Sequence, residues 1–211
     1  MGFKHTGLFP EQAVNWDWMI DKIQKAGREI KVLNLFAYTG GATVACAYAG
    51  AQVVHIDSSK GMVAWAKENI ASSGLSDKPV RFMIDDVTKF VLREIRRGNK
   101  YDAIIMDPPS YGRGKNGEVW QFENNIADLV NLCSKVLSEN PLFFLINSYT
   151  TGISSKVLEN MLYLELVRSQ EIDKKLKEEI SKGKFSSGEI GIPMRDSKLV
   201  LPCGIYARWE K

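Results

Sequence analysis

The sequence predicts a doubly wound α/β domain, in which a mostly parallel sheet is covered by helices on both faces. Short apolar runs alternate with helical segments along residues 14–147, and these runs are continuously apolar rather than alternating apolar and polar. Continuous apolar runs are typical of parallel strands that are buried on both faces. Two more strand-like runs end the chain with only a short loop between them, which predicts an antiparallel hairpin that closes the sheet.

The predicted elements follow one another in a regular order. Residues 1–13 carry no periodic pattern and predict an extended N-terminal arm, whereas 14–211 predict one domain. The domain opens on a helix over 14–29, with Val14, Trp18, Ile20 and Ile23 available for burial. Strands are predicted over 31–38, 51–57, 79–85, 101–107 and 141–147, and helices between them over 42–50, 59–74, 87–98 and 119–138. The list is completed by a polar loop over 110–118, a helical insertion over 154–182, and closing strands over 188–194 and 198–210.

The composition is that of a soluble globular domain and disfavours several other classes of protein. Hydrophobic residues make up 45% of the chain and charged residues 25%, which argues against a disordered chain. No run reaches the apolar length of a membrane span and no signal-peptide pattern is present, so we expect a cytoplasmic protein without membrane contact. Cys46, Cys133 and Cys203 form no CxxC pair, and the two histidines are His5 and His55, so neither a disulfide framework nor a metal site is expected.

A glycine turn follows the first predicted strand, at the edge where open α/β sheets bind ligands. Residues 34–41 read NLFAYTGG, and such a turn lets the backbone approach a ligand and directs a helix N-terminus towards it. Asp57 ends the second strand, where its carboxylate can accept both hydroxyls of an adenosine ribose. This combination predicts an adenosine-containing cofactor, and it is compatible with both nicotinamide dinucleotides and S-adenosylmethionine.

The glycine pattern of this turn helps to separate the two cofactors. A dinucleotide site requires GxGxxG because a pyrophosphate lies on the turn. Here the loop has Gly40 and Gly41, with Phe36 and Tyr38 at positions where small residues would be expected. The pattern therefore favours a cofactor without phosphates, although a strand–helix turn without any ligand would also explain a glycine pair on its own.

The segment Asp107-Pro108-Pro109-Ser110-Tyr111 directly follows the fourth predicted strand and is the strongest functional motif. Two consecutive prolines cannot continue a sheet ladder, and they fix a rigid, extended exit from the strand. Such stiffness holds a carboxylate and backbone carbonyls against a substrate, whereas the alternative is a plain loop breaker. Asp86, after the third strand, could accept a hydrogen bond from an adenine amino group, cap the next helix, or do both.

Taken in order, the segments NLFAYTGG, HID, DDV and DPPSY resemble those of the class I S-adenosylmethionine-dependent methyltransferases. The chain resembles in particular the bacterial family that contains the 23S ribosomal RNA cytosine-5 and guanine-7 methyltransferases, over residues 7–209. The arm sequence GLFPEQ resembles the segment of that family that helps to enclose the cofactor. The resemblance implies a seven-stranded sheet with an antiparallel C-terminal strand, and S-adenosylmethionine as the cofactor without a metal.

The resemblance also implies roles for particular residues. The loop after the first strand would contact the methionine part of the cofactor, Asp57 with Ser58 the ribose, and Asp86 the adenine. The place where the methyl group meets its acceptor would be bordered by Asp107, Pro108, Pro109 and Tyr111. The implied cofactor contacts are Gln12, Asn34, Phe36, Ala37, Tyr38, Thr39, Gly40, Gly41, Asp57, Ser58 and Asp86.

The cysteine positions bear on the chemistry of the transfer. Cytosine-5 transfer needs a thiolate that attacks the ring, and in the family this cysteine follows the fifth strand. Here residues 145–150 read LINSYT, and Cys203 is expected to be a buried structural thiol. We therefore expect transfer to a base nitrogen without a cysteine nucleophile, because a ring nitrogen with a lone pair needs only correct positioning.

The expected partner is RNA, in particular ribosomal RNA. The net charge of +3 predicts only modest RNA affinity from this chain alone, and many relatives carry an RNA-binding domain ahead of the arm. Arg113 and Lys115, beside Tyr111, are the candidates for contact with phosphate and a stacked base. The alternatives are a methyltransferase for a small molecule or a protein, a nicotinamide-dependent oxidoreductase, and an inactive module that only binds. Cofactor binding and methyl transfer would distinguish among these, and the sequence leaves the oligomeric state open.

Overall fold

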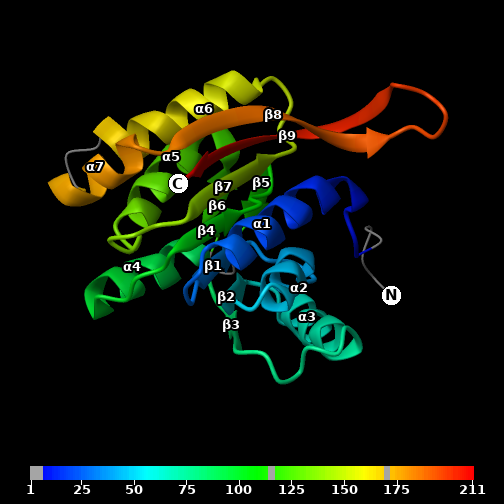
Figure 1. The fold of residues 1–211 in the computed structure, drawn as a ribbon, viewed down its shortest axis with the longest axis horizontal. Coiled ribbons are helices and arrows are strands. Elements are labelled where there is room, and N and C mark those ends of the chain that lie inside the picture. Colours follow the sequence, from blue (N-terminus) through cyan, green and yellow to red (C-terminus); the bar gives the residue numbers. More distant parts are fainter. Residues whose placement is uncertain (1–6, 114–116, 169–171) are drawn as a thin grey trace.

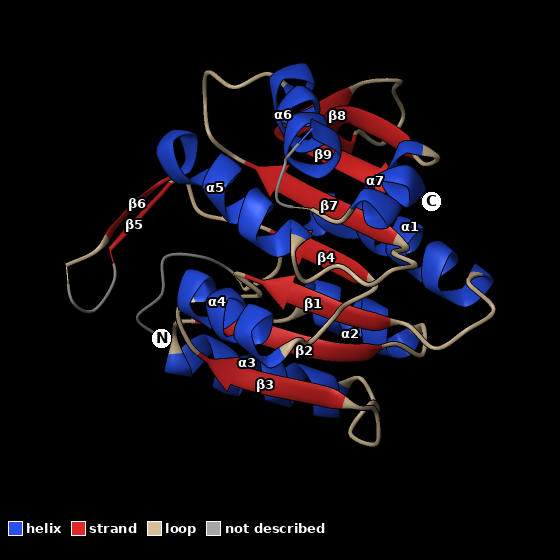
Figure 2. Cartoon of the chain, turned by 90° about the vertical axis from the view of Figure 1, so that its left-hand side faces the viewer, coloured by secondary structure: helices blue, strands red, loops and turns tan. Residues whose placement is uncertain are grey.

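The computed structural model describes residues 7–113, 117–168 and 172–211, which form a seven-stranded sheet between two layers of helices (Figures 1 and 2). The strands are β1 (Lys31–Leu35), β2 (Gln52–Asp57), β3 (Val80–Ile84), β4 (Ala103–Met106), β7 (Phe143–Ser148), β8 (Lys184–Pro193) and β9 (Val200–Glu210). They lie in the order β3-β2-β1-β4-β7-β9-β8. β9 is antiparallel to both of its neighbours and the other pairs are parallel, which confirms the predicted fold class.

Two groups of helices cover the two faces of the sheet (Figure 2). The first group is α1 (Ala13–Lys25), α2 (Gly41–Tyr48) and α3 (Lys60–Ser72), and the second is α4 (Val87–Arg97), α5 (Phe122–Ser134), α6 (Ser155–Tyr163) and α7 (Lys174–Ser181). Successive residues of a strand point to opposite faces, so Val32 packs with the first group and Leu33 with the second. The central strands are apolar throughout because both of their faces are buried.

The helical segment near the C-terminus packs on the sheet. Leu162 of α6 and Ile180 of α7 are fully buried, in the same cluster as Phe144 of β7 and Trp209 of β9. A short π-helical segment (Leu164–Arg168) continues α6 and contributes the buried Leu166. The described part of the segment expected over 154–182 carries these helical elements, and it covers one face of the sheet rather than projecting into solvent.

The beginning of α1 differs from the prediction. A 3-10 turn, η1 (Pro10–Gln12), leads directly into α1. The buried residues of α1 are Asn15, Met19 and Ile23. These three are spaced four apart and define one face of the helix, which leaves Val14 on another face and 49% exposed. The expected burial of Val14 is therefore wrong.

Two further expectations are corrected by the structure. The segment predicted as a loop over 110–118 contains a strand, β5 (Tyr111–Arg113), which pairs antiparallel with β6 (Val119–Gln121). The following helix, α5, accordingly begins later and ends earlier than predicted. Cys46 and Cys133 are buried free thiols, whereas Cys203 lies on β9 and is only partly buried. The residues described by the structure include no helix long and apolar enough to cross a membrane.

Candidate active site

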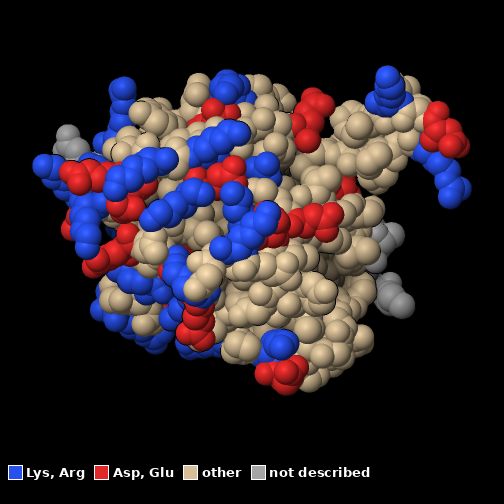
Figure 3. Space-filling view, in the orientation of Figure 1, with Lys and Arg blue, Asp and Glu red and all other residues tan. Residues whose placement is uncertain are grey.

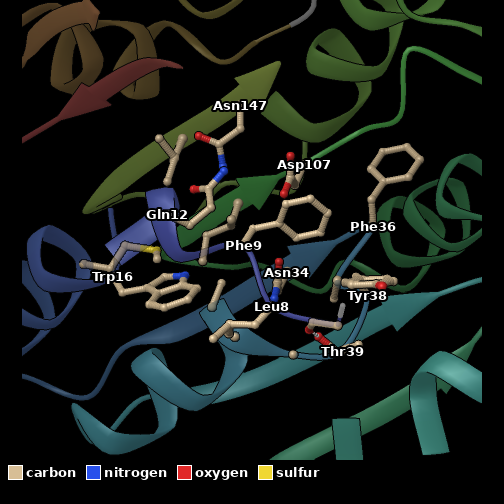
Figure 4. A pocket seen from close by; sticks show the side chains of 18 residues that line it. Leu8, Phe9, Gln12, Trp16, Asn34, Phe36, Tyr38, Thr39, Asp107 and Asn147 are labelled. Atoms are coloured by element: carbon tan, nitrogen blue, oxygen red, sulfur yellow. Dashed lines mark hydrogen bonds between the residues drawn. The ribbon is translucent and has the colours of Figure 1, made fainter. Parts of the chain in front are cut away.

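The strand order reverses between β1 and β4, because the chain runs from β1 towards one edge of the sheet and from β4 towards the other. At such a switch point the connections diverge at the carboxyl ends of the strands and open a crevice. A cavity lies there, between the N-terminal segment and the ends of β1, β4 and β7 (Figure 4). The predicted site residues that line it are Gln12, Asn34, Phe36, Ala37, Tyr38, Thr39, Gly40, Gly41 and Asp107.

The turn after β1 carries aromatic side chains on a left-handed backbone. The φ angles are 55° at Phe36 and 50° at Tyr38, followed by 88° at Gly40. A left-handed conformation costs a residue with a side chain about 1–2 kcal/mol, so glycine would be the less strained choice at the first two positions. Both aromatic side chains line the cavity, and Gly41 is required because a Cβ there would lie 2.8 Å from the Trp16 ring.

Asp57 at the end of β2 is tied to this turn. One carboxylate oxygen accepts a hydrogen bond from the backbone N–H of Tyr38 at 2.9 Å, and the other accepts from that of Ser59 at 2.8 Å. Burial raises the pKa of Asp57, and these two N–H groups oppose the increase. Each carboxylate oxygen has a second lone pair, so Asp57 can still accept two hydroxyl groups from a ligand.

Asp107 lines the cavity, and the negative charge of Glu11 acts on it. Burial and the negative charge of Glu11 raise the pKa of Asp107 to about 7. Glu11, on η1, is 7% exposed. Burial, together with the charges of Asp107 and Glu11, also raises the pKa of the Tyr149 phenol, which therefore stays protonated. Buried carboxylates without compensating charge favour a positively charged ligand.

The N-terminal segment covers the cavity. The ring of Phe9 lies between Tyr38 and Tyr149, with centroid distances of 5.7 Å and 5.9 Å. Gln12 donates to the Tyr149 hydroxyl at 2.7 Å. Asn15 then donates both to Gln12 at 2.9 Å and to Asn147 of β7 at 3.0 Å. These bonds fasten the beginning of the described chain to the end of a central strand.

A second, larger cavity of about 630 Å³ adjoins the first. Phe36 lines both of them, and the second is also lined by Ser58, Asp86, Pro109 and Arg113, which are predicted site residues. Asp86 caps α4, because its carboxylate accepts from the backbone N–H of Lys89 at 2.8 Å. The structure therefore divides most of the predicted residues between two neighbouring cavities rather than gathering them in one, and Asp57 lines neither of them.

The remaining predicted residues lie beside these cavities or outside the described chain. Pro108, the residue after Asp107, is buried. Tyr111 is 50% exposed on β5, and neither residue lines a cavity. The Tyr111 hydroxyl accepts from Arg113 Nε at 2.9 Å. Lys115 lies outside the described residues. Among the described residues, no cluster of His, Cys, Asp and Glu has an arrangement suited to a metal ion.

Cys203 lies near the carboxyl end of β7, because Ser148 at that end pairs with Ile205 of β9. Its thiol donates to the backbone oxygen of Leu201 at 3.4 Å, and Cys203 lines neither cavity. The expected burial of this thiol is wrong, although the structure gives it no contact with the cavities.

Several residues of the site were not predicted from the sequence. Asn147 ends a predicted strand, so the rule that ligands bind at the carboxyl ends of strands could have identified it. Phe9, Trp16 and Tyr149 offer no comparable signal, because their places depend on contacts between distant segments. Trp120 donates from its indole N–H to the Pro109 carbonyl at 2.7 Å, and its ring lies 5.3 Å from that of Phe36. It was missed because the β5–β6 hairpin was predicted as a loop.

The chain is similar in sequence and in structure to known methyltransferases. A ribosomal RNA large subunit methyltransferase K/L from Shewanella frigidimarina is 37% identical over 141 residues, which cover 66% of this chain and 19% of the relative. The crystal structure of a SAM-dependent methyltransferase from Agrobacterium tumefaciens superposes with a TM-score of 0.86 at 37% identity, over 100% of this chain and 65% of that one. A methyltransferase crystallised with S-adenosylhomocysteine shares the fold, with a TM-score of 0.73 at 20% identity over 96% of this chain and 50% of that one.

The chain spans about a fifth of the length of the ribosomal RNA relative and about two thirds of the Agrobacterium protein. Residues 2–154, more than half of the chain, match the family model described as S-adenosylmethionine-dependent methyltransferase. The matched region contains the turn after β1, Asp57 and the DPPSY segment. The chain therefore belongs to the S-adenosylmethionine-dependent methyltransferase family.

Proposed function

We propose that this chain transfers a methyl group from S-adenosylmethionine to a nitrogen of an RNA base, in ribosomal RNA. The observation that carries the proposal is the placement of Asp107, next to the two prolines, on the same cavity as the turn after β1. The turn after β1 would hold the cofactor, and the rigid segment 107–111, here called the acceptor loop, would border the acceptor. In this proposal the two segments meet at one edge of the sheet. The ribosomal RNA relative, which is 37% identical, supports RNA as the acceptor class.

The residues present fit the cofactor. The first cavity is narrow, with a volume of about 50 Å³, and the Asp107 carboxylate that lines it suits the ammonium group at the amino acid end of the cofactor. Asp57 lies beside the shared turn and has free lone pairs for the two ribose hydroxyls. The larger second cavity, with Ser58 and Asp86, would hold the adenine. When bound, the cofactor supplies an electrophilic methyl group on a sulfonium centre.

The chain's own residues would position the acceptor. Pro108 and Pro109 fix the backbone after β4, and the Trp120 indole holds the Pro109 carbonyl in a set direction. A base nitrogen attacks with its own lone pair, so proximity and alignment suffice without a covalent intermediate. If the accepting nitrogen carries a hydrogen, the ionised carboxylate of Asp107 is the group that would take that proton.

The charge distribution bears on RNA affinity. Lysine and arginine side chains alternate with aspartate and glutamate over the charged part of the face in Figure 3, without a patch of one sign. With a net charge of +3, few phosphates would be neutralised, so the affinity for RNA should be modest and depend weakly on salt. Arg113, exposed on β5 beside Tyr111, is the described side chain best placed to contact phosphate near the acceptor.

The test is tritiated methyl transfer from S-adenosylmethionine to unmodified large-subunit ribosomal RNA, followed by mass spectrometry of the digested nucleosides. Asp107→Asn should lower the rate by a factor of about 10² or more, since it removes both the charge and the proton acceptor. Asp77→Asn is the matched control, because Asp77 is an exposed aspartate with a side chain 74% accessible. It should transfer at the wild-type rate.

The outcomes separate the parts of the proposal. RNase-sensitive label in a base-nitrogen product, lost in Asp107→Asn, would support it. Label in 5-methylcytidine would overturn the choice of a base nitrogen. If the chain binds the cofactor yet leaves every RNA unlabelled, the RNA substrate would have to be withdrawn in favour of a small-molecule or protein acceptor.

A further inference from the structure

Three buried polar side chains form a row behind the turn after β1. Asn34 of β1 donates from Nδ2 to the Thr43 hydroxyl of α2 at 2.9 Å, and that hydroxyl lies 2.9 Å from Nδ1 of His55 on β2. The exposed fractions of the three residues are 2%, 0% and 0%. Asn34 lines the first cavity, whereas Thr43 and His55 do not, so these two can influence a ligand there only through Asn34.

The row of hydrogen bonds has a direction. An amide nitrogen can only donate, so the Thr43 oxygen accepts from Asn34, and the single hydroxyl proton is left for His55 Nδ1. Burial lowers the pKa of His55 to about 4, so the ring is neutral near pH 7. A neutral imidazole that accepts at Nδ1 carries its proton on Nε2. Nε2 has no hydrogen-bond partner among the described residues.

We propose that Thr43 and His55 are positioning residues that hold the Asn34 amide with its carbonyl oxygen towards the cavity. Figure 4 shows this orientation, with the side-chain oxygen of Asn34 directed into the cavity and the nitrogen directed away. The proposal rests on the proposed function, because the ligand of that oxygen would be the ammonium group of S-adenosylmethionine. A rotated amide would instead present N–H donors to a cation.

Packing cannot select between the two orientations, because the oxygen and the NH₂ group of an amide are nearly the same size. In the reversed row, Asn34 Oδ1 would accept from Thr43, and Thr43 would accept from a proton on His55 Nδ1. The two arrangements therefore place the imidazole proton on different nitrogens. For this reason the tautomer of His55 reports the orientation of Asn34.

The first experiment measures that tautomer by long-range ¹H–¹⁵N NMR on the whole chain without cofactor. The chain has two histidines, so His5→Gln leaves the signals of His55 alone. We expect the proton on Nε2. Asn34→Asp offers only an acceptor to Thr43, which should reverse the row and move the proton to Nδ1. A proton on Nδ1 in the chain with Asn34, or an unchanged tautomer in Asn34→Asp, would overturn the proposal.

The second experiment compares two substitutions at Thr43 by calorimetric titration with S-adenosylmethionine. Thr43→Val keeps the shape and removes the hydroxyl, and should weaken binding about tenfold. Thr43→Ser keeps the hydroxyl and should bind within about twofold of wild type, whatever its melting temperature. Equal affinities of the two variants would overturn the positioning role. A wild-type chain that does not bind the cofactor would overturn the proposed function, and the His55 tautomer would still decide how Asn34 is held.

Discussion

At the residue scale, the ionisation of Asp107 links the site to pH. Its pKa is raised from 3.8 to about 7 by burial and by the charge of Glu11, while the other titratable group facing it, Tyr149, stays protonated. The folded protein therefore holds this proton more tightly than the unfolded chain does. The free energy of unfolding consequently falls as the pH rises from 3.8 to about 7, because over this range the unfolded chain has lost the proton that folded Asp107 still holds.

The affinity for the cofactor should change with pH in the opposite direction to the free energy of unfolding. A cation is attracted to ionised Asp107, so the affinity for S-adenosylmethionine should rise with pH up to about 7 and level off above it. Asp107→Asn should remove this dependence. Calorimetric titrations at a series of pH values from about 5.5 to 8.5 measure it. An unchanged slope in Asp107→Asn would assign the pH dependence to another group, and Asp77→Asn should retain the wild-type slope.

At the scale of elements, the N-terminal segment and the β5–β6 hairpin are the two parts that complete the sheet edge. The first closes over the cavity through Phe9 and Gln12, and the second holds the acceptor loop through Trp120. Neither element belongs to the central sheet, so each can be altered without removing a strand. Their contributions to binding and to transfer can therefore be measured separately.

Phe9→Ala should loosen the cover over the cavity. The substitution removes ring contacts with Tyr38 and Tyr149, which together account for about 1–2 kcal/mol, so S-adenosylmethionine should dissociate about tenfold faster. Stopped-flow displacement measures the rate. Val14→Ala, on the exposed side of α1, is the control and should leave the rate unchanged. An equal rate in Phe9→Ala would show that the segment does not retain the cofactor.

Trp120→Phe should affect transfer more than cofactor binding. Phenylalanine keeps a ring against Phe36 but loses the hydrogen bond to the Pro109 carbonyl, which contributes about 0.5–1.5 kcal/mol. We expect kcat for methyl transfer to fall by about 2- to 10-fold while the Kd for S-adenosylmethionine stays the same. A variant that loses cofactor affinity instead, with kcat intact, would contradict this role for the indole N–H.

At the scale of the whole molecule, the question is whether the C-terminal helices fold with the sheet. Leu162 is fully buried among β-sheet residues, which joins α6 to the same core as the central strands. Leu162→Ala should lower the free energy of unfolding by about 2–5 kcal/mol in a single transition, as measured by denaturant titration. Val157→Ala, 59% exposed on the same helix, should change it by less than about 0.5 kcal/mol. A separate early transition in Leu162→Ala would indicate an independent unit.

Much of the fold could be predicted from local pattern. The apolar runs of β1, β2, β4 and β7 mark strands buried on both faces, and the closing hairpin follows from two adjacent strand patterns. These features are encoded in neighbouring residues, so a reading along the chain detects them. The hairpin of β5 and β6 escaped detection because its strands are three residues each, too short to carry a period.

Part of the candidate site could also be predicted, because some of its residues are next to predicted strands in the sequence. The turn 34–41 and Asp107 directly follow strands, and the carboxyl ends of parallel strands meet at one edge, so their convergence follows from the fold class alone. Only the tertiary structure decided how the site is closed and how its polar groups are held. Asn15 and Asn147 bond across 132 positions of sequence, and the row behind Asn34 joins two strands and a helix. Local periodicity does not predict such pairs, because burial and hydrogen-bond direction arise only when distant segments pack together.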